Sequence, residues 1–467
     1  MEETFDLAVI GSGTGGYPAA IKAAQKGLKV ALIESGEVGG TCLNRGCIPS
    51  KALISGAEVL QQIKEAEHFG IHVENTTVDY AKLTQHKDQV VNKMRTGLQG
   101  LIQANGITLI KGKGRLTGPK EIKVLGEQNH LIRADKIIIA TGSEPRSMPA
   151  FPCDYERIHD STSLLQMTKL PKSLAIIGGG VIGCEFASLF NILGVEVTIL
   201  ELMPSIIPTE CAIIREALAK TLAKRGISIK TGVKVEKVER NEKGVQIVLE
   251  GGEQVDAEMV LVSVGRSMNS SDIGLEKAGI AAEPQGTIKV NERMETNVPG
   301  IYAVGDLVGR WWLAHVATHQ GVVAAINATG GNAVMHYNAI PAVIYTHPEA
   351  ASVGMSEEAA KDQGIETVIG NFPFQALGKA QAAGHPEGFV QIVADKKNGE
   401  ILGAQVFGHE ASTLIAQMTM AIANELTLES VAETIHAHPT MSEAWHEAAN
   451  IALGAPLHWP PSKRKKG

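Results

Sequence analysis

Residues 5–16 read Phe5-Asp-Leu-Ala-Val-Ile-Gly11-Ser-Gly13-Thr-Gly-Gly16, and an alanine-rich run follows at 17–26. The apolar start predicts a buried strand, and the run after Gly16 predicts a helix. A second apolar segment at 29–33 ends at Glu34. This order of strand, Gly-x-Gly-x-x-Gly, helix, strand and acid is typical of dinucleotide binding. The glycines admit a pyrophosphate, the helix N-terminus attracts it, and the acid accepts the ribose hydroxyls.

The same pattern occurs a second time. An apolar segment at 174–177 leads into Gly178-Gly-Gly180-Val-Ile-Gly183, a helical stretch runs to Leu193, and the segment 196–200 ends at Glu201. The first glycine and the acid are 23 residues apart in both copies (34 − 11 and 201 − 178). One glycine motif is weak evidence, but two complete copies with equal spacing predict two dinucleotide sites in two domains.

Glu201 also bears on the choice of nucleotide. A carboxylate at this position suits an unphosphorylated ribose and repels a 2′-phosphate. No Lys or Arg follows before Arg215, so a 2′-phosphate has no evident anchor. The sequence therefore favours NAD over NADP.

Two further apolar segments predict that the first domain is discontinuous. The segment 136–140 ends in Thr141-Gly142, and 300–304 ends in Gly305-Asp306. We expect both to join the sheet of the first fingerprint, with Asp306 at the carboxyl edge where open α/β sheets bind ligands. The expected division is a first nucleotide domain at 1–145, a second one inserted at 146–272, a part completing the first at 273–337, and a C-terminal domain at 338–467.

The C-terminal part carries no further glycine fingerprint. Alternation and helical periodicity predict a mixed α+β domain. Strands are expected at 342–345, 366–372, 389–394 and 401–407, and helices at 356–363, 411–424 and 428–434. The fold class is therefore α/β, with two Rossmann-like domains, the second inserted into the first, and a C-terminal α+β domain.

Two cysteines stand close together in Gly-Gly-Thr-Cys42-Leu-Asn-Arg-Gly-Cys47-Ile-Pro-Ser-Lys, residues 39–51. In an ideal helix about 140° and 7.5 Å separate positions i and i+5, whereas a disulfide needs Cα atoms about 4.4–6.8 Å apart. If the two cysteines bond, the backbone must curl, and Gly46 and Pro49 stand where they permit it. So small a loop stabilises little. The pair is therefore interpreted as a redox dithiol beside a bound cofactor.

A candidate base lies near the other end of the chain, in His436-Ala-His438-Pro-Thr-Met-Ser-Glu443. A lone histidine is usually structural, but His438 can exchange protons near neutral pH and Glu443 is close enough to orient it. A dithiol needs such a base because the thiolate is the nucleophile. Periodicity alone does not connect His438 to Cys42.

The composition excludes several classes of protein. The 467 residues suggest several domains, and a net charge of −7 gives no reason to bind nucleic acid or an anionic membrane. Five cysteines make no disulfide scaffold, and no targeting segment precedes the first strand, so we expect a reducing, cytoplasmic location. Residues 311–348 lack Asp, Glu, Lys and Arg, but His and Asn interrupt them, so no membrane span is expected. No metal site is expected.

Taken together, these motifs resemble the flavoprotein disulfide reductases over essentially the whole chain, and among them the dihydrolipoyl dehydrogenase family. The resemblance implies FAD in the first fold, NAD in the inserted one, and a homodimer in which His438 of one subunit reaches the dithiol of the other. It implies oxidation of protein-bound dihydrolipoyl groups by NAD⁺. The partners would be lipoylated carrier domains of 2-oxo acid dehydrogenase or glycine cleavage complexes.

The resemblance also implies roles for single residues. Cys42 would exchange disulfides with the substrate, Cys47 would face the flavin, and Glu443 would orient the base His438. Lys51 and Glu185 match positions that pair beside the flavin. The FAD-binding residues implied are Gly11, Gly13, Gly16, Glu34, Gly40, Thr41, Lys51, Gly114, Thr141, Gly142, Asp306 and Ala314. The NAD-binding residues implied are Gly178, Gly180, Gly183, Glu185, Glu201, Val235 and Gly265.

Some features depart from the family pattern, and they bear on the alternatives within and outside the family. Trp311-Trp312 is unusual, and Gln320 stands where many relatives carry Glu. An NADPH-dependent reductase of the same family remains the alternative, although it would need basic residues after Glu201. A mercuric reductase would add a C-terminal cysteine pair, and no cysteine follows Cys211. A non-catalytic flavin-binding subunit would have no need for Cys42, Cys47 and the base.

Overall fold

The computed structural model describes residues 2–242 and 244–460 and divides the chain into two compact units. Unit 1 comprises the chain up to Ser55, Asp79–Leu170 and Ser263–His336. Unit 2 comprises Gly56–Val78, Pro171–Val262 and the chain from Tyr337 onward. Helix α3 (Cys47–Glu65) begins in unit 1 and ends in unit 2. The three-domain division expected from the sequence stays a prediction.

Unit 1 is built on the sheet that contains the first fingerprint. Its order is β3-β2-β1-β6-β5-β4, with β17 beside β6, and the strands β3, β2, β1, β6 and β17 are parallel. The strands are β1 (Glu2–Ile10), β2 (Val30–Glu34), β3 (Thr108–Lys111), β4 (Lys113–Gly118), β5 (Glu121–Leu125), β6 (His130–Ile139) and β17 (Ile301–Ala303). The remaining elements of unit 1 are α1 (Gly16–Gln25), α2 (Gly40–Arg45), α4 (Tyr80–Ala104), β7 (Ser143–Pro145), β8 (Ile158–Asp160), α5 (Ser161–Leu164), β16 (Arg266–Met268) and α8 (Ala314–Ala328).

The strand order confirms that this sheet is assembled from distant segments. Ala8 of β1 pairs with Ile137 of β6, and Ile138 pairs with Tyr302 of β17. The prediction that 136–140 and 300–304 join the first sheet is therefore correct. Both faces of the parallel strands are covered, which explains their continuous runs of apolar residues.

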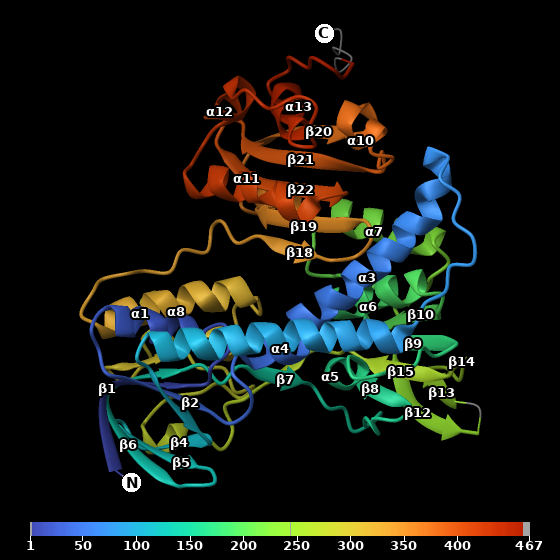
Figure 1. Ribbon diagram of the computed structural model, residues 1–467. Coiled ribbons are helices and arrows are strands. Elements are labelled where there is room, and N and C mark those ends of the chain that lie inside the picture. Colours follow the sequence, from blue (N-terminus) through green and yellow to red (C-terminus); the bar gives the residue numbers. More distant parts are fainter. Residues whose placement is uncertain (1, 243, 461–467) are drawn as a thin grey trace. The chain divides into compact units, whose positions relative to one another are not determined.

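Helices α1 and α8 lie side by side in unit 1 (Figure 1). Their contact depends on small residues, because a Cβ on Gly321 would come within 2.1 Å of the Gly15 carbonyl oxygen. The Thr318 hydroxyl also donates to the Thr14 carbonyl, at 2.9 Å. Helix α8 is thereby fixed against the loop that carries the first fingerprint.

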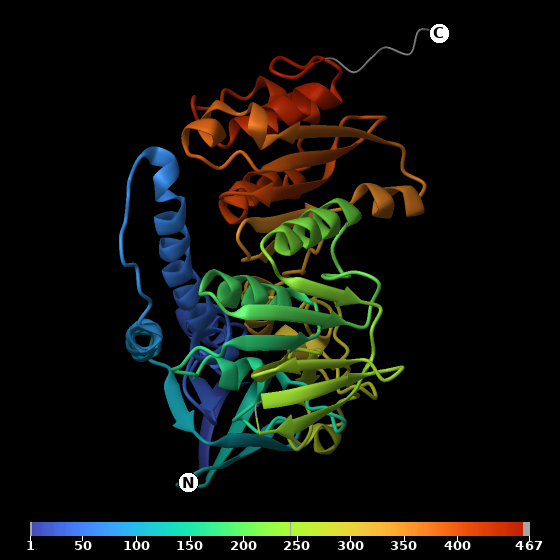
Figure 2. The same ribbon diagram turned by 90° about the vertical axis from the view of Figure 1, so that its right-hand side faces the viewer.

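In unit 2 the second fingerprint repeats this parallel arrangement. Strands β11, β10, β9 and β15 run parallel in that order, and β12, β13 and β14 form an antiparallel sheet (Figure 2). The elements are β9 (Ser173–Ile177), α6 (Val181–Ile192), β10 (Glu196–Glu201), α7 (Ala212–Lys224), β11 (Ser228–Thr231), β12 (Val235–Asn241), β13 (Gly244–Leu249), β14 (Gln254–Ala257) and β15 (Met259–Val262). The predicted second Rossmann-like unit is confirmed.

The C-terminal part of unit 2 is an antiparallel sheet of order β18-β19-β22-β21-β20, packed against helices. Its strands are β18 (Ala342–Ile344), β19 (Glu349–Gly354), β20 (Thr367–Pro373), β21 (Gly388–Asp395) and β22 (Ile401–Gly408). Its helices are α9 (Glu357–Asp362), α10 (Gly378–Ala382), α11 (Ala411–Ala423), α12 (Leu428–Glu433) and α13 (Glu443–Ala452). The expected α+β character is confirmed, and β19, α10 and α13 are elements that the sequence did not indicate.

Helices α11 and α13 form the core with this sheet. Helix α11 packs on β19 and β22, and α13 packs on β20 and β21. The fully buried Trp445 joins the two helices, because its indole N–H donates to the Leu414 carbonyl at 3.1 Å. Glu443 is the first residue of α13, so the packing of this helix places the Glu443 carboxylate.

Across the described chain, no helix combines the length and the apolar character that crossing a membrane requires.

Gly370 of β20 lies where α13 comes closest to the sheet, and a Cβ at this position would be 1.9 Å from the Ala448 carbonyl oxygen. We predict that Gly370→Val lowers the thermal unfolding midpoint, because overpacking of this kind costs about 1–3 kcal/mol. The control is Gly378→Ala in α10, where a Cβ meets no atom within 4 Å. Differential scanning calorimetry of both variants checks this, and equal midpoints would contradict the tight α13–β20 contact.

Candidate active site

Glycine occurs at the three positions of the first fingerprint for different structural reasons. Gly11 has φ +100°, and a Cβ there would be 2.3 Å from the Ala140 carbonyl oxygen. A Cβ on Gly16 would be 1.8 Å from the Gly11 carbonyl oxygen, so this glycine lets α1 pack on the turn. At Gly13, the nearest atom to a Cβ is the Cα of Gly40, at 3.8 Å. No close protein contact demands glycine there, but backbone approach to a pyrophosphate does.

The second fingerprint repeats this geometry. Gly178 has φ +105°, and a Cβ on Gly180 would meet no atom within 4 Å. The turns are closed by equivalent bonds, Gly11 N–H to the Ile33 carbonyl at 2.8 Å and Gly178 N–H to the Leu200 carbonyl at 2.9 Å. Both loops thus have the open second glycine of a nucleotide cradle.

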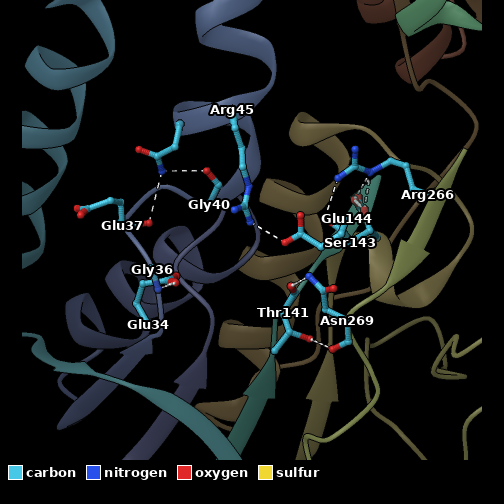
Figure 3. A network of polar contacts seen from close by, with 12 residues as sticks. Glu34, Gly36, Glu37, Gly40, Arg45, Thr141, Ser143, Glu144, Arg266 and Asn269 are labelled. Atoms are coloured by element: carbon cyan, nitrogen blue, oxygen red, sulfur yellow. Dashed lines mark hydrogen bonds and ion pairs between the residues drawn. The ribbon is translucent and has the colours of Figure 1, made fainter. Parts of the chain in front are cut away.

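The acids at the ends of β2 and β10 fix their loops in the same way. One oxygen of Glu34 accepts the N–H of Ser12 at 2.8 Å, and one oxygen of Glu201 accepts that of Gly179 at 2.5 Å. The other oxygen of each acid accepts the N–H two residues further on, at 2.7 Å in both (Figure 3 shows this bond at Glu34). Glu201 is only 7% exposed. Each carboxylate has about four acceptor sites, so both keep capacity for ribose hydroxyls.

The two cysteines lie on either side of a break between helices. Cys42 is in α2, and Cys47 is the first residue of α3. Gly46 makes the break with φ −145° and ψ −110°, and a Cβ there would be 3.0 Å from the Thr41 carbonyl oxygen. The helix is thus interrupted between the two cysteines, Pro49 lies in the first turn of α3, and both cysteines are free thiols. That the pair forms a redox disulfide stays a prediction.

The environment makes the two sulfurs different. A hydrogen bond with Cys47 and burial raise the pKa of the Cys42 thiol far above its ordinary value, and the charge of Lys51 only partly opposes this. The hydrogen bond and the burial therefore favour the protonated form of the Cys42 thiol.

The dithiol segment rests directly on the first fingerprint. Gly39 donates its N–H to the Ser12 carbonyl at 3.0 Å, and a Cβ on Gly40 would be 2.6 Å from the Cα of Gly13. Gly39 and Gly40 have φ of +99° and +60°. The Asn44 amide adds bonds of 2.9 Å to the carbonyls of Val38 and Gly40, the second of which Figure 3 shows. Helix α2 is thus anchored at the open glycine of the cradle.

A polar network fixes Asp306 at the edge of the same sheet, and Figure 3 shows its Ser143–Arg266 and Thr141–Asn269 bonds. Arg266 donates to the Ser143 hydroxyl at 2.6 Å and to its carbonyl at 2.7 Å, and the hydroxyl donates to the Asp306 carboxylate. Asn269 accepts from the Thr141 hydroxyl at 2.7 Å and donates to the Thr141 carbonyl at 3.0 Å. The network joins 141–145 to 266–269 through the β7–β16 pair.

Sequence reasoning missed the supporting members of this site, which are Ser12, Ser143, Arg266 and Asn269. Ser143 completes the Ala-Thr-Gly-Ser stretch, so its motif was available as a signal. Arg266 and Asn269 are separated from it by more than 120 residues. Only the folded chain shows that they meet.

His438 and Glu443 form a hydrogen-bonded pair in unit 2. The Nδ1 of His438 donates to one carboxylate oxygen at 2.7 Å, and the Thr440 N–H donates to the other at 2.8 Å. Burial raises the pKa of Glu443, but the bonds from Thr440 and His438 outweigh this and lower it. The His438 side chain is 78% exposed. Its Nε2 is therefore the nitrogen left to take a proton from a molecule outside this unit.

The other predicted site residues lie in both units. The residues expected to bind FAD are in unit 1, and those expected to bind NAD are in unit 2, except Gly265 in unit 1. Gly114 lies in β4, Ala314 begins α8, Val235 begins β12, and Glu185 accepts the Tyr345 N–H at 3.0 Å. The pairing of Lys51 with Glu185 stays a prediction.

Within residues 2–242 and 244–460, no group of three or more His, Cys, Asp or Glu side chains is arranged to hold a metal ion.

Comparisons with known proteins agree with this geometry. The sequence profile of the pyridine nucleotide-disulphide oxidoreductases matches residues 5–321, and that of their dimerisation domain matches residues 340–449. The chain is 51% identical to the dihydrolipoyl dehydrogenase of Chlamydia pneumoniae, over 99% of this chain and 100% of the relative. It is 43% identical to that of Thermus scotoductus, over 98% and 99%.

Solved structures give the same result. LpdA from Mycobacterium tuberculosis superposes with a TM-score of 0.91 at 28% identity, covering 95% of this chain and 99% of that one. The HOCl-induced flavoprotein disulfide reductase RclA from Escherichia coli superposes with a TM-score of 0.86 at 29% identity, covering 96% and 99%. The paired thiols, the two nucleotide cradles and these similarities lead to one conclusion: the chain belongs to the pyridine nucleotide-disulphide oxidoreductase family.

Proposed function

We propose that this protein is a dihydrolipoyl dehydrogenase, which oxidises protein-bound dihydrolipoyl groups to lipoyl disulfide and reduces NAD⁺ to NADH. The observation that carries this proposal is the anchoring of the Cys42–Cys47 segment on an open dinucleotide cradle through Gly39 and Gly40. Relatives of this activity match the chain over their full length at up to 51% identity.

The residues present fit both cofactors. In unit 1, the open backbone at Gly13 suits the FAD pyrophosphate, Glu34 the adenosine ribose, and Asp306 the ribitol chain. In unit 2, Gly180 and Glu201 suit the same parts of NAD. When bound beside the dithiol, FAD would supply the two-electron redox chemistry that links the cysteine pair to NAD⁺.

The protein's own groups carry out the thiol chemistry on an oxidised Cys42–Cys47 pair. The partner subunit's His438 takes the proton of one substrate thiol at Nε2. The substrate thiolate attacks Cys42, the Cys42–Cys47 bond breaks, and Cys47 leaves as the thiolate. The second substrate thiol then attacks the first substrate sulfur and passes its proton to the leaving Cys42 sulfur, which closes the lipoyl disulfide and releases Cys42 as a thiol. The substrate loses two electrons, and the cysteine pair gains them.

The comparison with the family supports the homodimer that this mechanism needs. The profile of the dimerisation domain covers residues 340–449, which include His438. The lipoyl group would be presented by a carrier domain of a 2-oxo acid dehydrogenase or glycine cleavage complex, and the implied location is the cytoplasm.

The two cysteines have distinct spectroscopic consequences. We predict that mild reduction of the FAD-loaded protein produces a long-wavelength charge-transfer band, because the Cys47 thiolate lies beside the flavin. Cys47→Ser abolishes the band, whereas the matched Cys42→Ser keeps a thiolate at Cys47 and retains it. Absorption spectra of both variants check this. Survival of the band in Cys47→Ser would show that the two roles are wrongly assigned.

The assignment of His438 as the base leads to a second prediction. We expect His438→Ala to lower turnover of dihydrolipoamide by about 10²–10⁴-fold, the usual range for a general base, with FAD still bound. The control is His385→Ala, which changes a histidine elsewhere in unit 2. Steady-state assays with NAD⁺ measure the change. Near-normal turnover in His438→Ala would refute the assignment of the base.

The third prediction concerns the nucleotide. We expect kcat/KM for NADP⁺ to be about 10²-fold below that for NAD⁺, because Glu201 opposes a 2′-phosphate and like charges cost several kcal/mol. Glu201 holds its loop, so the informative variant is Leu202→Arg, where the side chain is 63% exposed. This change improves the use of NADP⁺, and Leu202→Gln is its uncharged control. Equal use of both nucleotides by the unmodified protein would contradict the argument.

A further inference from the structure

The chain after the catalytic helix α13 turns back on that helix. Ala455 donates its N–H to the Asn450 carbonyl at 2.9 Å, and Gly454 donates to the Ile451 carbonyl at 3.0 Å, with Gly454 at φ +76°. This pair of bonds is the Schellman turn that commonly ends helices. It reverses the chain, so that residues 455–460 run back toward the middle of α13.

His458 then closes on a buried carboxylate of α13. One oxygen of Glu447 accepts the His458 backbone N–H at 3.0 Å, and the other accepts from the ring Nδ1 at 2.8 Å. Glu447 is only 3% exposed. Among the described residues, the groups that pair with its charge are His458 and, at 3.5 Å, His446. A carboxylate so well buried needs such partners.

The next residue gives the returning segment a second attachment. The ring of Trp459 meets that of Phe372 edge to face, with centroids 6.3 Å apart. Phe372 belongs to β20, on which α13 packs. Residues 453–460, which we name the strap, are therefore attached both to the helix and to the sheet beneath it.

The strap is linked to the base through one helical turn. Glu443 and Glu447 are four residues apart on α13, so they lie on the same face. Glu443 holds Nδ1 of His438, and the charge of His458 is among the influences that lower the pKa of Glu443. The contacts thus form a continuous chain from His458 through Glu447 and α13 to Glu443 and His438.

We propose that the strap fixes the N-terminal turn of α13, and that His458 is a positioning residue for the His438–Glu443 pair. The consequence for catalysis rests on the proposed function, but the effect on the pair does not. An attachment that served only to hold the chain end would leave the titration of His438 unchanged.

The geometry also gives the strap a direction of pH dependence. The hydrogen bond and charge of Glu447 raise the pKa of His458. The ion pair between His458 and Glu447, which we name the clasp, is therefore fully formed below the ordinary histidine pKa of about 6.5. It weakens as pH rises through the raised pKa of His458. The other titratable groups around it are Glu443, His438, His446 and, in ring contact with His446, His436.

The test is the pKa of His438 in FAD-loaded protein with labelled histidines, followed by NMR of the imidazole resonances. His438→Gln identifies the resonance. We expect His458→Ala to lower the pKa of His438, because a looser Glu443 stabilises the protonated ring less. We also expect kcat to fall about tenfold, within the cost of a small misplacement. Glu447→Gln repeats both effects by changing the other side of the clasp.

Two variants serve as controls. His458→Asn keeps a side-chain donor near the position of Nδ1 and restores most of the wild-type behaviour. Leu457→Ala changes the neighbouring residue, which is 64% exposed, and leaves the titration and the rate unchanged.

The outcomes separate the two proposals. If His458→Ala and Glu447→Gln lower only the unfolding temperature and leave the pKa of His438 and kcat unchanged, the strap is a structural attachment and the inference is wrong. If the wild-type protein fails to turn over dihydrolipoamide, the proposed function is wrong, and the NMR titration still tests the strap.

Discussion

One backbone contact determines how this protein joins thiol chemistry to a nucleotide site. The Gly39-Gly40 turn rests on Ser12 and Gly13, so the helix with Cys42 begins at the point where the fingerprint is open. A side chain at Gly40 would separate the two segments, because a Cβ there would be 2.6 Å from the Cα of Gly13. The cysteine pair is thus tied to the cradle by main-chain atoms, which do not change rotamer. Rigid placement of this kind is what electron transfer between a dithiol and a cofactor requires.

In both nucleotide folds, a glutamate holds the glycine loop by the same hydrogen bonds. In each, an acid at the end of the second strand accepts the N–H that follows the first glycine and the N–H two residues after itself. The acid therefore shapes the loop before any ribose arrives. This double role explains why a carboxylate, buried and already hydrogen-bonded, is suited to this position. It also means that changes of nucleotide preference are better sought at exposed neighbours such as Leu202.

The proposed acid–base pair, His438 and Glu443, is held in a different way. The His438 side chain is exposed, while Glu443 holds its ring nitrogen Nδ1 and the backbone of Thr440 holds Glu443. The helix that carries Glu443 packs on the sheet at Gly370 and is joined to α11 by Trp445, and its Glu447 holds the returning chain. An exposed base on a well-supported helix suits a reaction in which the substrate arrives from another molecule. In α13, Glu443 orients the imidazole, and Trp445 and Glu447 further along hold the helix in place.

The sequence by itself determined the local features. Glycine spacing, apolar runs and the two acids predict both Rossmann-like folds, and the strands at 136–140 and 300–304 were assigned to the correct sheet. These predictions succeed because a turn that needs positive φ favours glycine. A strand buried on both faces likewise requires a continuous run of apolar residues. At Gly46 the sequence indicated only that a break was permitted, and the structure has one there.

Only the tertiary structure decided which distant groups meet. Arg266 and Ser143, or Gly39 and Ser12, have no local signal that pairs them, because their contacts arise when separate strands and loops reach the same sheet edge. Strand β19 was missed because its short, alanine-rich sequence does not alternate strictly between buried and exposed residues. Helix α13 was missed although its buried Ala444, Trp445, Ala448 and Ala449 recur with helical spacing, so this signal was present in the sequence. The difference between Cys42 and Cys47 also required the fold. Two identical side chains differ only through what surrounds them, and burial, the hydrogen bond and the charge of Lys51 are properties of the assembled site.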